Sequence, residues 1–232
     1  MPTPTCQSYN KIAEWFDEAR DKNLVEKEYL ELILRAASAG SEVLDLGCGA
    51  GEPLARFFME RGYLVTGIDG SWKMIELCQK KFSPQNFKQS FSQNFSKNSA
   101  QNPQQNPPAN SVENFAGNFF VADMRDLNLG KKFAVILAWD SFFHLTRAEQ
   151  RSMFATFAAH ILAGGILAFT SGSSDGEVWS DNNGEMLYHS SLSKEEYRDL
   201  LERHGFEVLL CDVSERVVWV AKKSDEVNNA AV

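Results

Sequence analysis

The sequence contains few cysteines and no visible sorting signal, and these absences exclude several classes of protein. Its four cysteines lie far apart and form no Cys-x-x-Cys pair. This distribution excludes the usual zinc-binding spacings and the dense disulfide framework of a small secreted domain. The first residues lack a basic segment followed by an apolar stretch, so we predict no signal peptide. We therefore expect no metal site and a cytoplasmic location.

The chain also lacks basic clusters and long apolar runs. It carries 23 Lys and Arg residues against 31 Asp and Glu residues, a formal net charge of −8. An acidic chain without a Lys/Arg-rich run is a poor match for non-specific binding to nucleic acid or to an anionic membrane surface. The longest apolar runs, such as 133–139, are far shorter than the roughly 18 residues that span a membrane. We expect no membrane association and disfavour nucleic acid as a partner.

One segment, 83–110, has a composition unlike the rest of the chain. Its 28 residues include six Asn, six Gln, five Ser and four Pro, and no Leu, Ile or Val. Such a segment buries too little apolar surface to offset its conformational entropy, so we predict a disordered surface insertion. Phe87, Phe91 and Phe95 follow a helical spacing, which leaves a second possibility, a helix that docks on a partner.

Outside that insertion, short apolar segments alternate with helical ones. The predicted strands are 42–46, 63–68, 119–122, 133–139, 166–170, 206–213 and 216–221. The predicted helices are 53–61, 72–82, one that begins after Thr146 and ends at Gly164-Gly165, and 193–204. The stretch between 170 and 193 is predicted to be irregular. The alternation favours a mostly parallel sheet covered by helices on both faces, which is a doubly wound α/β fold.

The last two predicted strands are an exception to the parallel arrangement. Only Ser214 and Glu215 separate them, too few residues for a crossover, so this pair is predicted to be antiparallel. We expect a single domain over residues 1–222, interrupted by the 83–110 insertion and followed by a flexible tail at 223–232.

A glycine-rich turn follows the first predicted strand. The segment Asp45-Leu46-Gly47-Cys48-Gly49-Ala50-Gly51 has the spacing G-x-G-x-G, and its glycines allow tight turns and leave space for a ligand against the backbone. The dinucleotide fingerprint G-x-G-x-x-G/A would place its last small residue at Glu52. A carboxylate at that position disfavours a nicotinamide dinucleotide.

Acidic residues follow the second and third predicted strands, which lie on either side of the insertion. Asp69 lies about 20 residues beyond the glycine turn, where a carboxylate can accept hydrogen bonds from ribose hydroxyls. Its alternative role is to cap the helix that starts at Trp72, although Ser71 can fill that role itself. Asp123 and Met124 follow the third strand and offer a carboxylate for an exocyclic amine and a thioether for a ring.

These segments together resemble one enzyme family. The most specific part is V-L-D-L-G-C-G-A-G at 43–51 with G-I-D at 67–69, and the segments 121–126, 133–145 and 163–172 match more loosely. The chain is similar to the class I S-adenosylmethionine-dependent methyltransferases, and more narrowly to small-molecule methyltransferase-domain proteins of bacteria. The resemblance covers nearly the whole chain outside 83–110 and the last ten residues. It implies a Rossmann-like seven-stranded sheet of order 3-2-1-4-5-7-6, with strand 7 antiparallel, and an N-terminal helical lid.

The resemblance also implies the cofactor, S-adenosyl-L-methionine, with S-adenosyl-L-homocysteine as its product. The residues that would bind it are Asp45, Gly47, Cys48, Gly49, Asp69, Gly70, Trp72, Asp123, Met124 and Trp139. Asp45 and the glycines after it would line the methionine part, and Asp69 would hold the ribose. Asp123 and Met124 would frame the adenine, on which Trp72 would pack.

The acceptor side is less well defined by the sequence. Tyr9, in a segment that resembles the N-terminal lid of this family, would border the methyl-transfer cavity. His144 and Asp140 follow the fourth strand and are the candidate catalytic residues, because a histidine can serve as a general base and an aspartate can orient the acceptor. Trp179 and His189 are candidate wall residues of an acceptor pocket. Each has a structural alternative, as a cap or as simple packing.

We expect a methyltransferase that acts on a small-molecule acceptor. One alternative is an enzyme that methylates protein or nucleic acid, which the acidic charge and the absence of an N/D-P-P-Y/F/W motif disfavour. Another is a non-catalytic scaffold that binds the cofactor. An oxidoreductase that uses a nicotinamide dinucleotide is disfavoured by Glu52 and by the lack of a Tyr-x-x-x-Lys pair.

Overall fold

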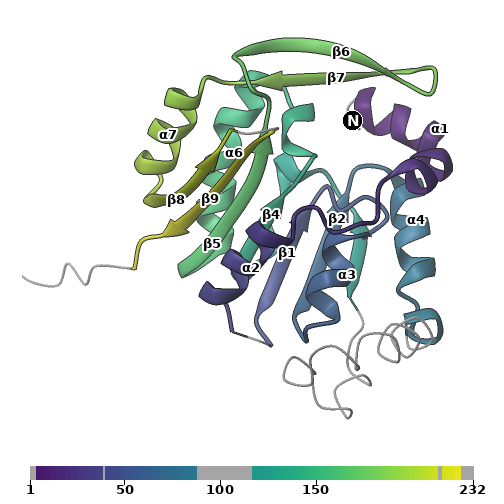
Figure 1. The fold of residues 1–232 in the computed structure, drawn as a ribbon, viewed down its shortest axis with the longest axis horizontal. Helices are drawn as coiled ribbons and strands as arrows, with labels where there is room; N and C mark the ends of the chain where they lie inside the picture. Colours follow the sequence, from purple (N-terminus) through teal and green to yellow (C-terminus); the bar gives the residue numbers. More distant parts are fainter. Residues whose placement is uncertain (1–3, 39, 88–116, 214–215, 226–232) are drawn as a thin grey trace, which may run out of the picture.

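The computed structural model describes residues 4–38, 40–87, 117–213 and 216–225, and Figure 1 shows its ribbon. The helices are α1 (Pro4–Ala19), α2 (Lys27–Ala36), α3 (Leu54–Met59), α4 (Trp72–Lys81), α6 (Arg147–His160) and α7 (Lys194–Arg203), with 3-10 turns η3 (Met124–Asp126) and η4 (Phe142–His144). The strands are β1 (Glu42–Leu46), β2 (Leu64–Asp69), β3 (Asn118–Val121), β4 (Phe133–Ala138), β5 (Ile161–Ser171), β6 (Gly176–Asn182), β7 (Glu185–Ser191), β8 (Phe206–Asp212) and β9 (Val217–Lys223). Within these ranges, no helix combines the length and the apolar character needed to cross a membrane.

The main sheet has seven strands in the order β3-β2-β1-β4-β5-β9-β8. Strands β1 to β5 are parallel to one another, whereas β9 is antiparallel to both β5 and β8. The predicted order 3-2-1-4-5-7-6 and the antiparallel C-terminal pair are therefore confirmed. Because the first five strands of the sheet run in one direction, their carboxyl ends lie along one edge, where ligands bind in such folds.

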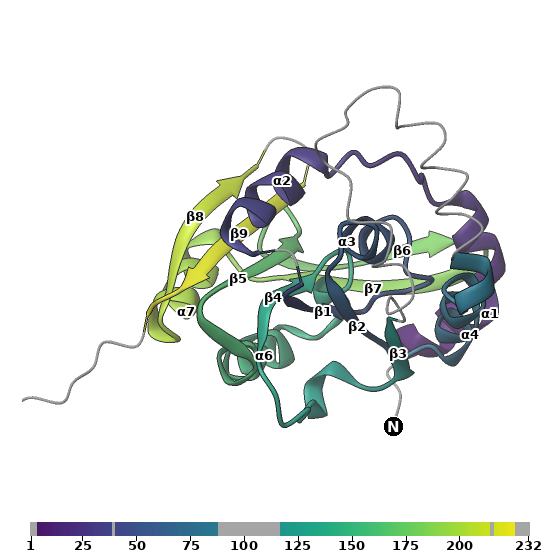
Figure 2. The same ribbon diagram turned by 90° about the horizontal axis from the view of Figure 1, so that it is seen from below.

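Helices cover both faces of the sheet, as Figure 2 shows. Helices α2, α3 and α4 pack on one face through a cluster that includes Leu30, Phe58 and Ile75. Helices α6 and α7 pack on the other face through a cluster that includes Phe154 and Tyr197. Burial of both faces explains why β4 is a continuous apolar run rather than an alternating one.

The junction between α6 and β5 differs from the prediction that Gly164-Gly165 ends the helix. Helix α6 ends at His160, and Ile161 is already extended, with φ −100° and ψ 144°. Ile161 pairs with Phe133 in β4, and the register then shifts. The two glycines lie inside β5 next to this shift, so they accommodate a bulge in the strand rather than the end of the helix.

A β-hairpin and a helix are absent from the sequence prediction. The stretch expected to be irregular forms the antiparallel hairpin β6-β7. Its turn is Asn183-Gly184, with φ values of 53° and 82°, as a two-residue hairpin turn requires. Helix α2 was not predicted either, although its Leu30 and Ile33 are fully buried. In Figure 1 the hairpin extends across the top of the molecule to α1, and so it covers the edge with the strand ends.

The boundaries of the predicted insertion and tail also need correction. Phe87 is 2% exposed, and its ring centroid lies 5.8 Å from that of Phe82, so 83–87 belong to the packed domain. Lys223, the first residue of the predicted tail, is the last residue of β9. The rest of the insertion, with Phe91 and Phe95, lies outside the described residues, as does 226–232.

Candidate functional site

A cavity lies at the carboxyl ends of β1, β2, β3 and β4, under α1. It brings together nine of the ten residues predicted to hold the cofactor, namely Asp45, Gly47, Cys48, Gly49, Asp69, Gly70, Asp123, Met124 and Trp139. Tyr9, Asp140 and His144 line the same cavity. The fold thus brings residues that lie between positions 5 and 145 of the sequence together around one cavity.

The glycine turn after β1 forms the floor of the cavity. The N–H groups of Gly47 and Cys48 donate to the carbonyl oxygen of Ile68 at 2.7 and 2.9 Å, which ties the turn to the end of β2. Gly47 has a φ of +75°, and a Cβ there would lie 2.3 Å from the Cβ of Ser141. Only glycine fits this position, because both the backbone conformation and the space exclude a side chain.

Asp69, at the end of β2, organises the turn as well as facing the cavity. Its carboxylate accepts the N–H of Gly49 at 2.9 Å and the N–H of Ser71 at 2.7 Å. The helix cap is provided by Ser71, whose hydroxyl accepts the N–H of Met74 at 3.2 Å. Burial raises the pKa of Asp69, and the two backbone hydrogen bonds oppose this rise. The capping alternative is therefore met by Ser71, and the Asp69 side chain lines the cavity.

Asp45 is a buried carboxyl group on the same floor. Asp45 is the fourth of the five residues of β1, two positions before Gly47, and it is 3% exposed. Burial and the nearby Asp69 carboxylate raise the pKa of Asp45 to about 7, although the positive charge of Arg20 lowers it in part. No hydrogen bond or ion pair holds this carboxyl in the part of the chain that the structure describes. A buried acid without a partner has a strong preference for a cationic ligand.

Carboxyl groups dominate the charge of the cavity wall. Six of them line it, from Asp17, Asp45, Glu52, Asp69, Asp123 and Asp140, against one arginine, Arg20, and no lysine among the described residues. Four of the acids pair with cations from outside the wall. Lys81 pairs with Asp17 and, at 2.8 Å, with Glu52, while Arg125 pairs with Asp123 and Arg216 pairs with Asp140 at 2.7 Å. Glu52 also pairs with Arg56 at 2.6 Å. Asp45 and Asp69 have no such cation among the described residues, so they leave the wall with an excess of carboxyl groups.

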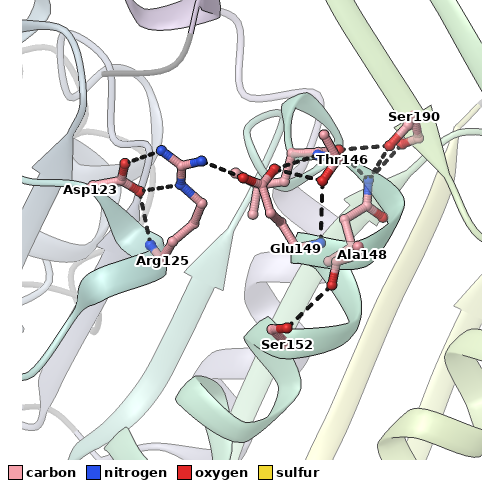
Figure 3. Close-up of polar contacts among 9 residues, drawn as sticks. Asp123, Arg125, Thr146, Ala148, Glu149, Ser152 and Ser190 are labelled. Atoms are coloured by element: carbon pink, nitrogen blue, oxygen red, sulfur yellow. Dashed lines mark hydrogen bonds and ion pairs between the residues drawn. The ribbon is translucent and has the colours of Figure 1, made fainter. Parts of the chain in front are cut away.

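Asp123 is held by an arginine that the sequence prediction did not include. The carboxylate accepts the backbone N–H and the Nε–H of Arg125 at 3.0 and 2.9 Å, which keeps the pKa of Asp123 below its usual range. Arg125 also pairs with Glu149, which forms a capping box with Thr146 at the start of α6. Figure 3 shows this chain of contacts from β3 to α6. Asp123 therefore faces the cavity as a fixed, ionised acceptor.

His144 and Tyr9 form a hydrogen-bonded pair at the other end of the cavity. The Nδ1 atom of His144 lies 2.7 Å from the carbonyl oxygen of Tyr188, and a carbonyl can only accept, so Nδ1 carries the proton. Nε2 then has a free electron pair and accepts the hydroxyl of Tyr9 at 3.0 Å. Burial lowers the pKa of His144 to about 4, with a smaller contribution from His189. The imidazole is neutral at physiological pH, with its basic nitrogen toward Tyr9.

Asp140 follows β4 and is engaged by two arginines. Arg216 donates to both of its carboxylate oxygens at 3.0 and 2.7 Å, and Arg20 lies 3.5 Å away. The residue has a φ of 48°, and its backbone N–H donates to the hydroxyl of Thr170 at 2.8 Å. Its carboxylate therefore anchors cations at the cavity wall, and the predicted role of orienting an acceptor remains a prediction.

Three predicted site residues lie outside the cavity wall. Trp72 is the first residue of α4 and is 52% exposed, and Trp179 in β6 is 54% exposed and packs against Tyr188. His189 contacts the rings of Phe143 and His144, with centroid separations of 5.2 and 4.7 Å. Trp72 and Trp179 therefore do not line this cavity. His189 is a neighbour of His144 and lines a second pocket, together with Phe143 and Ser190.

The comparisons with known proteins agree with this geometry. A family model for a methyltransferase domain matches residues 17–210. The chain is similar in structure to the magnesium protoporphyrin IX methyltransferase of Synechocystis PCC 6803, crystallised with bound SAM (TM-score 0.65, 16% identity, 96% of this chain and 97% of that chain). It is also similar to an amino pentose methyltransferase of Micromonospora echinaspora (TM-score 0.61, 17% identity, 91% of this chain and 95% of that one).

A curated relative matches at higher identity over a shorter region. A putative methyltransferase of Geobacillus sp. strain WCH70 is 32% identical over 85 residues, which are 34% of this chain and 33% of that protein. The match thus spans about a third of the relative's length. The family model, in contrast, extends over most of this chain and confirms the resemblance inferred from the glycine turn and Asp69. The chain belongs to the methyltransferase domain family.

Proposed function

We propose that this protein transfers a methyl group from S-adenosyl-L-methionine to a small-molecule acceptor. The observation that carries the proposal is the acidic cavity around the glycine turn, with the buried Asp45 carboxyl left without a partner among the described residues. This cofactor carries two positive groups, a sulfonium and an ammonium. A cavity with an excess of carboxyl groups is complementary to such a ligand.

The residues that line the cavity fit each part of this cofactor. Asp45 supplies a carboxylate for the ammonium group, and the glycine turn leaves the backbone open beside it. Asp69 supplies acceptor oxygens for the ribose hydroxyls. Asp123, kept ionised by Arg125, supplies an acceptor for the adenine amine, and Met124 a thioether surface for the ring.

The bound cofactor would supply an activated methyl group, because a sulfonium is already a good leaving group. The chain would then contribute mainly alignment, which alone accounts for roughly 7–11 kcal/mol in well-oriented reactions. An acceptor that must lose a proton would give it to the Nε2 atom of His144, displacing the Tyr9 hydroxyl from that nitrogen.

The cover over the cavity supports a small acceptor. Ser8 and Lys11 of α1 both bond to Glu185 at the start of β7, at 2.9 to 3.0 Å. The hairpin and the lid helix are thereby joined above the strand ends. A covered site admits a small molecule more readily than a folded protein or a duplex.

Cofactor affinity is expected to fall as the pH falls below 7. In the free protein Asp45 has a pKa of about 7, so below this pH it is largely protonated and cannot pair with an ammonium group. S-adenosylhomocysteine should bind about tenfold more weakly at pH 6 than at pH 8, as expected for one group whose deprotonation is required. Calorimetric titrations at pH 6, 7 and 8 would measure this. Asp45→Asn should bind weakly and equally at all three values, and a wild-type affinity independent of pH would contradict the assignment.

The acceptor class is tested by following the methyl group. Purified protein is incubated with methyl-tritiated S-adenosylmethionine and with three separate pools, which are small metabolites, proteins and nucleic acids. We expect label to appear in the small-metabolite pool. Label in protein or nucleic acid would overturn the small-molecule assignment, and an absence of transfer despite cofactor binding would favour a non-catalytic scaffold.

A further inference from the structure

Gln150 is a buried amide near the start of α6. It is 0% exposed, and its backbone N–H donates to the carbonyl oxygen of the cap residue Thr146 at 2.9 Å. A buried polar side chain lowers the stability of a protein unless hydrogen bonds satisfy it. Met153, Phe154 and Phe157, which follow on the buried side of α6, are apolar. The contacts of the Gln150 amide therefore have to account for a polar residue at this position.

The amide nitrogen of Gln150 joins two segments that are distant in sequence. Its N–H groups donate to the carbonyl oxygens of Leu145 at 3.0 Å and of Ser190 at 2.9 Å, and the Ser190 hydroxyl lies 2.8 Å away. That hydroxyl donates to the Leu145 carbonyl oxygen at 2.6 Å. Figure 3 shows Ser190, near the end of β7, beside the start of α6. Because Leu145 directly follows η4, the amide ties the hairpin to η4.

The same two segments form the hydrogen bond that orients His144. Leu145 follows His144 in sequence, and Ser190 lies two residues beyond Tyr188 in β7. Carbonyl groups two residues apart in a strand point to the same side, so those of Tyr188 and Ser190 share one edge of β7. The first accepts from Nδ1 of His144 at 2.7 Å, and the second accepts from Gln150. The amide therefore bridges the two segments that make the bond between His144 and Tyr188.

Tyr197 holds the amide in one orientation. Its hydroxyl donates to Oε1 of Gln150, and its oxygen accepts the N–H of Leu192 at 3.1 Å. A carbonyl oxygen can only accept, so the NH2 group must face Leu145 and Ser190, and Oε1 must face the tyrosine. Tyr197 is itself 0% exposed. A buried network with this many satisfied hydrogen bonds is rigid.

We propose that Gln150 is a positioning residue for the methyl-transfer reaction, which keeps the Tyr188 carbonyl oxygen against Nδ1 of His144. The inference rests on the proposed function, in which Nε2 of His144 takes the proton of the acceptor. A neutral imidazole carries its proton on only one of its two nitrogens. Without the amide, the carbonyl oxygen moves away from the ring, and the proton is free to occupy Nε2. In that tautomer the ring has no electron pair to offer to the acceptor.

The experiment replaces Gln150 with Met, which keeps the length of the side chain and removes its hydrogen bonds. Nitrogen-15 NMR of the histidine rings reports the tautomer, and the His144→Ala variant assigns the signal. The wild type should carry the proton on Nδ1, and Gln150→Met should show protonation of Nε2. The rate of methyl transfer should fall at least tenfold, since a misplacement of about 1 Å can cost about 100-fold. The affinity for S-adenosylhomocysteine should not change.

Three further variants separate positioning from packing. In the His144→Ala background, Gln150→Met should not lower the rate further, because Gln150 acts through the histidine. Tyr63→Phe is the matched control, since it loses a buried hydrogen bond to the carbonyl oxygen of Ala37 on the other face of the sheet, and it should keep the wild-type tautomer and rate. Tyr197→Phe removes only the support of Oε1 and should show smaller changes in the same direction, so it carries the test if Gln150→Met does not fold.

The outcomes separate this inference from the proposed function. A retained Nδ1 proton or a wild-type rate in Gln150→Met overturns the inference and leaves the proposed function standing. An equal fold loss of rate with and without His144 also overturns it, because such a loss indicates damage to the whole site. If the wild type binds the cofactor but transfers no methyl group, the proposed function fails and the NMR spectrum decides alone. A retained Nδ1 proton in Gln150→Met then overturns the positioning of His144, and protonation of Nε2 supports it.

Discussion

Replacing Asp69 with Ala is expected to weaken the binding of S-adenosylhomocysteine at least tenfold, or about 1.4 kcal/mol. The substitution removes the carboxylate proposed to hold the ribose. It also removes the acceptor for the N–H groups of Gly49 and Ser71, at 2.9 and 2.7 Å, so the glycine turn loses part of its support. Hydrogen bonds to a charged group contribute about 1.5–3 kcal/mol each, so a loss well beyond tenfold is consistent with this geometry. Calorimetric titration measures the effect directly.

Controls for this experiment come from the same chain and from a second ligand. Asp199→Ala removes an exposed carboxylate that pairs with Arg203 in α7 at 3.7 Å, and it should leave the affinity unchanged. Thermal unfolding of both variants shows whether the fold survives. NAD titrated into the wild type is expected not to bind. Tighter binding of NAD than of S-adenosylhomocysteine would mean that the glycine turn serves a different cofactor.

Replacing His144 with Ala is expected to lower the rate of methyl transfer about 100-fold for an acceptor that must lose a proton, within the range typical of general bases. The Nε2 atom is the proposed base, and the hydrogen bond to the Tyr188 carbonyl oxygen holds the imidazole in the required tautomer. The affinity for S-adenosylhomocysteine should not change. Because the pKa of His144 is about 4, the wild-type histidine stays neutral, and the difference between the two proteins should be constant from about pH 6 to 8.

Two variants separate catalysis from packing in this experiment. His204→Gln changes a histidine of the α7 end whose ring bonds to the carbonyl oxygen of Leu200, away from the cavity, and it should transfer methyl groups at the wild-type rate. Tyr9→Phe removes the hydroxyl that occupies Nε2 but keeps the ring, so it should retain more activity than His144→Ala. An unimpaired rate in His144→Ala would remove this residue from the mechanism.

The strands of the sheet could be predicted because their signals are local. Buried parallel strands appear as apolar runs such as 133–138, and the short link at 214–215 identifies an antiparallel pair. The errors arose where two local signals compete. Gly164-Gly165 matches a helix end as well as a bulge, and only pairing with β4 decides between them. The Asn183-Gly184 turn is itself a hairpin signal, and it could have identified β6 and β7 from the sequence.

Site residues at strand ends could be predicted from the sequence, because the backbone fixes their positions. Residues that reach the site through long side chains could not. Asp45, Asp69 and the glycines occupy fixed places at strand ends, so their spacing along the sequence already indicates a shared cavity. Arg20 and Arg125 reach the site through flexible side chains from a helix end and a 3-10 turn. Arg125 bonds to the nearby Asp123, but its second partner Glu149 and the Arg20 partner Asp140 are distant in sequence, and no spacing rule connects those pairs.

The hydrogen bond between His144 and the hairpin has a consequence for how the preference for a methyl acceptor could change. The histidine is oriented by a main-chain carbonyl of β7, which every residue type possesses, rather than by the Tyr188 side chain. The side chain of Tyr188 can therefore be exchanged without loss of the tautomer. This position of the hairpin is thus free to vary in shape and polarity while the Nε2 atom of His144 keeps its direction. Redesign of acceptor specificity would begin in β6 and β7 and leave η4 intact.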